Sequence, residues 1–289
     1  MRSLAAPFAA LVLVAAAPAP PGPSAAAAPS FDYKRENTVC RIARGDAGTS
    51  IQIIAPGEKE TSAFLTLPPG IPRKRPAVLW VHWLGEVATT NHTEFSSDAR
   101  ELANRGVISM LVDMPWSQKD WFTKVRAPDS DYADTLAQVV TLRRALDCLM
   151  QVYGVDRERI AYVGHDFGAM DGALMLAVDD RVQYAVLITP TLSFWEWYLL
   201  GTQPADPGAY VAQMSAFDLP GWLAKGKQKA TLLQFGQNDE YVSQATGIAL
   251  RNAVPNRDRT LKAYKLDHAL DDATARDDRR AWLIAHLGV

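Results

Sequence analysis

The chain has 289 residues, of which 48% are hydrophobic and 21% are charged, and its formal net charge is −2. This composition is typical of a soluble globular protein, and it offers no broad positive surface for the phosphates of a nucleic acid. The only two cysteines, Cys40 and Cys148, are too few for a disulfide scaffold or a zinc finger.

The N-terminus has the features of a secretory signal peptide. Arg2 precedes the apolar run Phe8–Ala17, and a Pro/Ala-rich stretch extends from there to Ala28. The apolar run is shorter than the roughly 20 residues that a membrane-spanning helix needs. We therefore expect residues 1–28 to be a signal peptide and residues 29–289 to be secreted or periplasmic. An uncleaved membrane anchor is the alternative.

The two cysteines have two possible states in an exported protein. Export would permit a disulfide between Cys40 and Cys148, because disulfides persist in oxidising compartments. Cys148 also lies among apolar residues of a predicted helix, where a buried free thiol would fit equally well. The sequence does not decide between the two.

Residues 29–289 are expected to form one α/β domain. Ser50–Ile54 and Thr61–Leu67 predict an antiparallel hairpin. From Pro76 onward, short and wholly apolar runs alternate with helix-length segments, which indicates parallel strands buried on both faces. The predicted parallel strands are Ala77–His82, Val107–Asp113, Arg159–Gly164, Val182–Thr189, Ala230–Gly236 and Leu261–Leu266. Together these segments predict a mostly parallel, eight-stranded sheet.

Helices are expected on both faces of this sheet, because five segments carry apolar residues at three- and four-residue spacing. They are Phe95–Asn104, Tyr132–Val152, Ala169–Ala177, Ser243–Ala253 and Asp272–Leu287. The connection 190–228 is longer and rich in aromatic residues. We expect it to form a small helical cap over the C-terminal ends of the strands, where α/β sheets bind ligands. Its candidate substrate-binding residues are Trp195, Trp197, Tyr198 and Tyr210.

The strongest local motif lies where the third parallel strand meets its helix, and reads Gly164-His165-Asp166-Phe167-Gly168. It resembles the nucleophile elbow of the α/β-hydrolase superfamily, with Asp166 in place of the usual serine. The elbow is a strained turn that needs small residues beside its centre, and Gly164 and Gly168 meet that need. At a helix N-terminus the Asp166 anion is favoured, and the N–H of Phe167 is available as an oxyanion donor. A helix-capping aspartate is the structural alternative.

The resemblance also implies the positions of two further catalytic residues. The superfamily places an acid after the next-but-one strand and a histidine after the last strand, and the sequence has Asp239 and His268 there. The implied catalytic triad is therefore Asp166, Asp239 and His268. Asp267 and Glu240 flank the expected positions and are the alternative acids.

The loop after the first parallel strand supplies the expected second oxyanion donor. It reads His82-Trp83 where relatives commonly carry His-Gly. The backbone N–H of Trp83 is the predicted donor, and its indole is predicted to line the substrate pocket. His82 is expected to fix this loop by hydrogen bonds, and His165 is expected to have a structural role.

Two branches of the superfamily suggest different chemistry. Over residues 45–289 the chain resembles dienelactone hydrolases, on the motifs above and on Arg143–Asp147. The aspartate elbow instead resembles epoxide hydrolases and haloalkane dehalogenases. A carboxylate that attacks an acyl carbonyl gives a reactive anhydride, whereas carboxylates suit displacement at saturated carbon. We therefore expect Asp166 to open an epoxide-like small molecule, and water activated by His268 to hydrolyse the resulting ester.

Several alternatives remain open at this stage. Tyr198 and Tyr210 could assist an epoxide oxygen, whereas Trp83, Trp195 or Trp197 could hold a halide, as in a dehalogenase. An esterase or lactonase could use Asp166 as a general base, and a noncatalytic binding protein could retain the fold. The sequence contains no glycine-rich phosphate loop, dinucleotide fingerprint or metal-ligand cluster, so no cofactor and no metal are expected. It predicts neither the substrate nor the oligomeric state.

Overall fold

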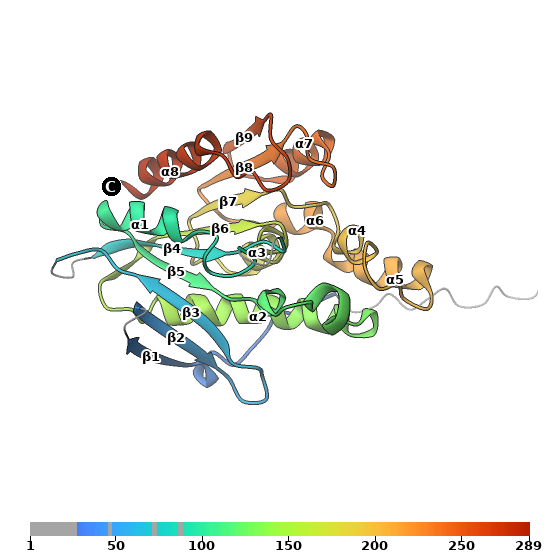
Figure 1. The fold of residues 1–289 in the computed structure, drawn as a ribbon, viewed down its shortest axis with the longest axis horizontal. Helices are drawn as coiled ribbons and strands as arrows, with labels where there is room; N and C mark the ends of the chain where they lie inside the picture. The colour runs from blue at the N-terminus through green and yellow to red at the C-terminus, as the bar shows by residue number, and fades with distance from the viewer. Residues whose placement is uncertain (1–27, 46–47, 71–73, 86–88) are drawn as a thin grey trace, which may run out of the picture.

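The centre of the molecule is a twisted sheet that runs through the whole domain (Figure 1). The computed structural model describes residues 28–45, 48–70, 74–85 and 89–289. Within them the sheet has nine strands in the order β1-β2-β3-β5-β4-β6-β7-β8-β9. The predicted signal peptide lies outside the described residues, apart from Ala28.

The strands follow the prediction closely, with one addition. They are β1 (Val39–Gly45), β2 (Gly48–Ile54), β3 (Thr61–Thr66), β4 (Arg75–Val81), β5 (Ile108–Val112), β6 (Val155–His165), β7 (Tyr184–Ile188), β8 (Ala230–Gly236) and β9 (Asp258–Tyr264). The pairs that involve β1, β2 and β3 are antiparallel, and the remaining pairs are parallel. The expected count of eight strands was wrong because β1 is a largely exposed edge strand, which lacks the apolar run that marks a buried one.

Helices cover both faces of the sheet. They are α1 (Ser96–Asn104), α2 (Asp131–Leu149), α3 (Phe167–Val178), α4 (Phe194–Tyr198), α5 (Pro207–Met214), α6 (Leu219–Leu223), α7 (Gln244–Ala253) and α8 (Ala273–Leu287). The side chains of β4 alternate between two cores. Leu79 and Val81 join the core beneath α2 and α3, whereas Val78 and Trp80 join the core beneath α1 and α8. None of the described helices has the length and apolarity needed to cross a membrane.

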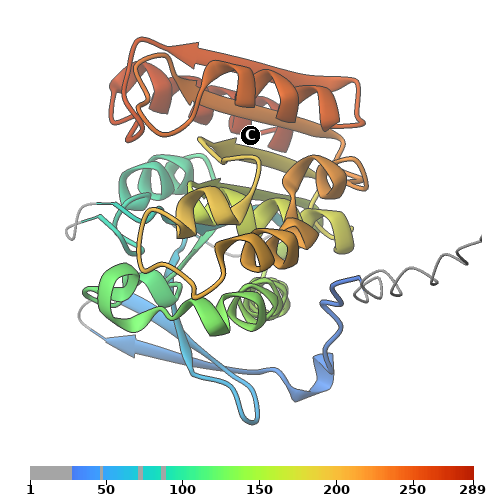
Figure 2. The ribbon, with the colours of Figure 1, turned by 90° about the vertical axis from the view of Figure 1, so that its right-hand side faces the viewer.

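The predicted cap segment, residues 190–228, contains α4, α5 and α6. These helices follow β7 and lie beyond the end of the sheet to which β7 points (Figures 1 and 2). Tyr198, Phe217 and Leu219 of this segment are buried in the same core as α3. The segment is therefore packed onto the domain at the carboxyl ends of the parallel strands.

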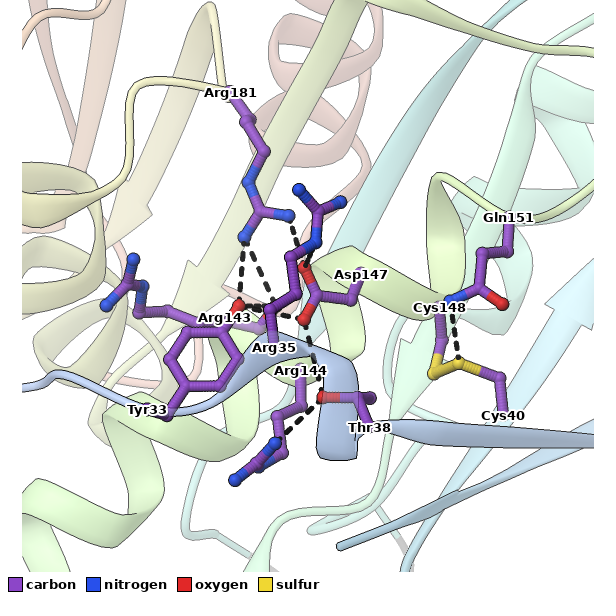
Figure 3. The surroundings of a disulfide bond; sticks show 10 residues. All are labelled: Tyr33, Arg35, Thr38, Cys40, Arg143, Arg144, Asp147, Cys148, Gln151 and Arg181. Atoms are coloured by element: carbon purple, nitrogen blue, oxygen red, sulfur yellow. Dashed lines mark hydrogen bonds and ion pairs between the residues drawn. A yellow bond between two sulfur atoms is a disulfide. The ribbon is translucent and has the colours of Figure 1, made fainter.

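The N-terminal segment is fixed to α2 by a disulfide and by an ionic network (Figure 3). Cys40 of β1 and Cys148 of α2 are joined by a disulfide, with 5.5 Å between their Cα atoms. Beside it, the buried carboxylate of Asp147 pairs with the guanidinium groups of Arg35 and Arg181. Of the two states that the sequence left open for these cysteines, the structure has the disulfide.

Candidate active site

The turn between β6 and α3 has the geometry of a nucleophile elbow. Asp166 adopts φ 53° and ψ −116°, a conformation that is strained for any residue with a side chain. A Cβ atom on Gly164 would overlap the backbone of Gly168, and one on Gly168 would overlap the carbonyl of Val81. The two glycines are therefore required by the close approach of strand and helix, as the sequence predicted.

The three residues of the predicted triad lie together. The Nδ1 atom of His268 is 2.8 Å from Oδ2 of Asp239, and its Nε2 atom is 3.8 Å from Oδ1 of Asp166. All three side chains are buried. The alternative acids, Asp267 and Glu240, are exposed, and Nδ1 of His268 is bonded to Asp239 instead.

Asp239 is held so that one oxygen is free for the histidine. Its Oδ1 atom accepts hydrogen bonds from the N–H groups of Tyr241 and Val242, at 2.8 and 2.9 Å. Burial works to raise the pKa of Asp239, but the hydrogen bonds from His268 and from these two amides outweigh it and lower the pKa below its usual value. Asp239 is therefore an anion that orients the imidazole.

His268 carries a proton in this arrangement at neutral pH. Burial alone would lower the pKa of the imidazole. The nearby carboxylate of Asp166 and the hydrogen-bonded carboxylate of Asp239 outweigh burial and raise the pKa of His268 to about 9. The resting site is therefore an imidazolium between two carboxylates.

The two oxygens of Asp166 have different surroundings. Oδ2 accepts a hydrogen bond of 3.1 Å from the backbone N–H of Leu84. Oδ1 faces His268 and has no hydrogen-bond partner among the described residues. The N–H of Phe167 lies in the first turn of α3, where the amides have no partner within the helix. One carboxylate oxygen is therefore held by the loop after β4, and the other is oriented toward the imidazole.

The predicted second oxyanion donor requires a correction. The N–H of Trp83 donates to Oε2 of Glu94 at 2.8 Å, so it is not directed at Asp166. The next amide along the loop, that of Leu84, occupies the position expected for Trp83. Neighbouring amides of a loop can point in different directions, and a sequence does not indicate which of the two faces the elbow.

The indole of Trp83 packs against two histidine rings, and the ring of His268 lies 6.3 Å from it between centroids. Its ring stacks on that of His165, with 5.0 Å between centroids and 6° between planes, and its N–H donates to Thr89. Trp83 lines a pocket of about 710 Å³, together with Glu94 and His165. Neither Asp166 nor His268 lines that pocket, so it lies beside the triad and not over it.

The four candidate residues of the cap have different positions. Trp197 lies across His268, with 5.1 Å between ring centroids. Tyr198 contacts Phe167 of the elbow, with 5.5 Å between ring centroids. Tyr210 lies deeper, where its hydroxyl donates to the carboxylate of Asp131, and Trp195 packs at the edge of the core. Trp197 is the one of the four that contacts a residue of the triad.

His82 has the structural role that the sequence predicted. Its Nδ1 atom donates to the carbonyl of Trp83 at 2.8 Å, and its Nε2 atom accepts from the N–H of Met114 at 3.0 Å. Full burial lowers the pKa of His82 to about 4, so the ring is neutral. It fixes the loop after β4 and has no direct contact with the triad.

Sequence reasoning missed two residues that the structure places at the site. Leu84 acts through its backbone, so its side-chain type carries no signal. Glu94 directly precedes a predicted helix, where an acidic residue is ordinary. Elsewhere among the described residues, no cluster of three or more His, Cys, Asp and Glu side chains could hold a metal ion.

Comparisons with known proteins bear on the fold. No protein-family model and no curated protein matches the sequence. Solved structures do match. An acetyl xylan esterase from Paenibacillus sp. R4 has a TM-score of 0.67 and 16% identity over 86% of this chain and 88% of its own. The chain has an α/β-hydrolase fold.

Two further structures support the same fold. Acetyl xylan esterase 1 from Thermoanaerobacterium sp. JW/SL YS485 has a TM-score of 0.67 and 15% identity, over 87% of this chain and 89% of its own. A protein designated a dienelactone hydrolase, from Klebsiella pneumoniae subsp. pneumoniae MGH 78578, has a TM-score of 0.59 and 16% identity, over 80% and 94%. At these identities the α/β-hydrolase likeness concerns the fold alone.

Proposed function

We propose that this chain is a hydrolase in which Asp166 attacks a saturated electrophilic carbon, best represented by an epoxide, and forms an alkyl-enzyme ester. The arrangement of the Asp166 carboxylate is the observation that carries this proposal. Oδ2 is held by the N–H of Leu84, whereas Oδ1 accepts no hydrogen bond from the part of the chain that the structure describes and is the more nucleophilic oxygen. A held oxygen becomes the ester carbonyl, and a free oxygen can form the new bond.

The first step uses the proton that His268 holds at rest. A lone pair of Asp166 Oδ1 attacks the epoxide carbon, and the carbon–oxygen bond of the ring breaks. The resulting alkoxide takes the proton from Nε2 of His268, which lies 3.8 Å from Oδ1. The products are a hydroxyalkyl ester of Asp166 and a neutral imidazole.

The second step needs His268 as a base, and the first step prepares it. Esterification removes the negative charge of Asp166, which is one of the two charges that raise the pKa of His268. The neutral imidazole takes a proton from water, and the hydroxide attacks the carbonyl carbon of the ester. The N–H groups of Leu84 and Phe167 stabilise the oxyanion that develops on Oδ2. Collapse breaks the bond between the carbonyl carbon and the alkoxy oxygen. That oxygen takes one of the two water protons and leaves as the diol, the other proton remains on His268, and Asp166 is again a carboxylate.

An esterase is the second candidate, and the solved acetyl xylan esterases of the same fold favour it. On that route Asp166 would act as a general base for water, and no covalent intermediate would form. A dehalogenase would use the indole N–H of Trp197, which is buried next to His268 and has no partner among the described residues. The assembled triad speaks against a noncatalytic binding protein.

We also propose that the mature protein is exported and acts on a small molecule. The signal-peptide pattern of residues 1–28 and the Cys40–Cys148 disulfide support export, because structural disulfides are typical of oxidising compartments. Asp166 is buried, and Trp197 packs on both His268 and Phe167 beside it, which suits a compact, largely apolar substrate.

Trapping the ester in a His268→Gln variant tests the proposed function. The variant is incubated with a series of aryl and alkyl epoxides, beginning with styrene oxide, and the Asp166 peptide is analysed by mass spectrometry. We expect a mass increase equal to that of the epoxide. The ester should form more slowly than in the native protein, because the alkoxide must take its proton from water, and it should persist, because hydrolysis of the ester has lost its base. The control variant Asp166→Asn should gain no mass. Hydrolysis of p-nitrophenyl acetate by the native enzyme, without an adduct from any epoxide, would favour the esterase instead.

A further inference from the structure

A second acid–histidine pair lies next to the triad, with His165 buried and Glu94 partly buried. Oε1 of Glu94 is 2.7 Å from Nδ1 of His165, the residue that precedes Asp166 in the elbow. Nε2 of His165 is 3.1 Å from the backbone carbonyl of His268. Oε2 of Glu94 accepts the N–H of Trp83 at 2.8 Å. The pair therefore connects the oxyanion loop, the elbow and the loop of the catalytic histidine.

We propose that Glu94 and His165 are positioning residues. They keep the N–H of Leu84 directed at the Asp166 carboxylate, and they fix the position of the His268 backbone relative to the elbow. This inference rests on the proposed function above. The carboxylate of Glu94 takes the N–H of Trp83, and the following amide, that of Leu84, is thereby directed at Oδ2 of Asp166. Neither Glu94 nor His165 contacts the Asp166 carboxylate itself.

Both ring nitrogens of His165 have an oxygen partner. Nδ1 faces the carboxylate of Glu94 and Nε2 faces the backbone carbonyl of His268, so the ring connects the two loops. The contact with Glu94 is partly buried. The indole of Trp83 stacks on the imidazole ring, with 5.0 Å between their centroids. The indole thus adds a second contact between the oxyanion loop and the elbow.

Misplacing the Leu84 amide should affect the two chemical steps unequally. During alkylation, negative charge leaves the carboxylate, so a hydrogen bond to Oδ2 gives no acceleration. During ester hydrolysis, a full negative charge develops on that oxygen, and loss of one such donor typically slows catalysis by about 100- to 1,000-fold. A positioning defect should therefore cause the ester to accumulate.

The test separates the two steps in single turnovers with styrene oxide, followed by mass spectrometry of the Asp166 peptide. Glu94→Ala should slow ester hydrolysis at least ~10-fold more than alkylation. Glu94→Gln should largely restore the rate of ester hydrolysis, because its amide oxygen can accept from the N–H of Trp83 while its NH₂ group lies at Nδ1 of His165. The control Glu58→Ala, which removes a bidentate contact to Arg144 far from the triad, should change neither step. Equal slowing of both steps, or failure of Glu94→Gln to recover, would overturn the positioning role.

A readout that does not depend on catalysis distinguishes this inference from the proposed function. Amide hydrogen exchange of Leu84 should accelerate at least ~10-fold in Glu94→Ala and stay near the native rate in Glu94→Gln. If no epoxide ever forms an adduct but this exchange pattern is found, the proposed chemistry fails and the positioning role stands. If Leu84 exchanges equally in the native protein and in Glu94→Ala, the positioning role fails, whatever the chemistry.

Discussion

Asp166 shows how much of the site depends on the surroundings of one side chain. Its positive φ angle directs the carboxylate out of the regular strand and helix on either side. The Leu84 amide then makes the two oxygens inequivalent, and His268 faces one of them. A serine in this conformation would suit acyl transfer, whereas a carboxylate with one held oxygen suits displacement at saturated carbon.

The raised pKa of His268 predicts a pH-dependent stability. Between the unfolded pKa of about 6.5 and the folded pKa of about 9, the native state binds more protons than the unfolded state. The stabilisation is therefore complete below pH 6.5, and it decreases as the pH rises through 9. We expect the free energy of unfolding to fall by about 2–3 kcal/mol across this window.

Urea unfolding at pH 6 and pH 9.5 measures this effect, and a His268→Gln variant serves as the control, because all other titrations are common to both proteins. The native protein should lose more stability than the variant. Equal losses would show that His268 is not held as an imidazolium by the two carboxylates.

The sequence predicted those site residues whose side-chain type carries the chemistry. Asp166, Asp239 and His268 could be placed because they follow predicted strands that end at one edge of the sheet. Leu84 could not, because a backbone amide looks the same for every residue type. The role of Glu94 depends on a contact across 71 residues with His165, and no local pattern encodes such a contact.

Of the secondary-structure elements, β6 and α3 matter most to the site, because the elbow between them positions Asp166. Gly164 of β6 approaches the backbone of Gly168 in α3 so closely that no side chain fits between them. The strand and helix can therefore cross at short range, which places Asp166 opposite the loop after β4. The apolar run that made β6 recognisable in the sequence thus leads into the turn that Gly164 and Gly168 flank.

Gly164→Ala tests the steric requirement. The added methyl group meets backbone atoms, which cannot rotate away, so we expect a loss of about 3 kcal/mol in the free energy of unfolding. The matched control is Gly221→Ala in α6, where an added Cβ meets nothing within 4 Å. It should be neutral or stabilising by up to about 1 kcal/mol. Similar effects of the two substitutions, measured by urea denaturation, would refute the close approach.

The buried strands were predictable because burial on both faces of the sheet requires continuous apolar runs. The helices were predictable because burial on one face repeats apolar residues at the helical period. Strand β1 was not predictable, because its exposed residues follow neither pattern. It forms by pairing with β2, from Val39 opposite Ile54 to Gly45 opposite Gly48. Edge strands of this kind are specified by their neighbours and not by their own sequence.

For the whole molecule, the N-terminal segment depends on covalent and ionic attachment to α2 (Figure 3). The disulfide joins residues that are 108 positions apart, and the Asp147 network lies directly beside it. The sequence allowed a disulfide but could not distinguish it from a buried thiol, because pairing depends on the distance between β1 and α2. The same segment supplies the edge strand that the sequence did not predict.

Removal of this disulfide should destabilise the domain. A Cys40→Ala/Cys148→Ala double variant is expected to lose roughly 2–5 kcal/mol of unfolding free energy, because a large loop of the unfolded chain is no longer closed. Reductant should lower the urea midpoint of the native protein and leave that of the double variant unchanged. A native protein that is insensitive to reductant would argue against the bond.

The most direct test of the account as a whole follows the oxygen atoms. A single turnover with an epoxide substrate in ¹⁸O-labelled water should place the label in the Asp166 carboxylate and leave the first-turnover diol unlabelled, because the diol carries away an oxygen that belonged to Asp166. Label found only in the product, with none in the Asp166 peptide, would show that water attacks the substrate directly and would contradict the covalent mechanism.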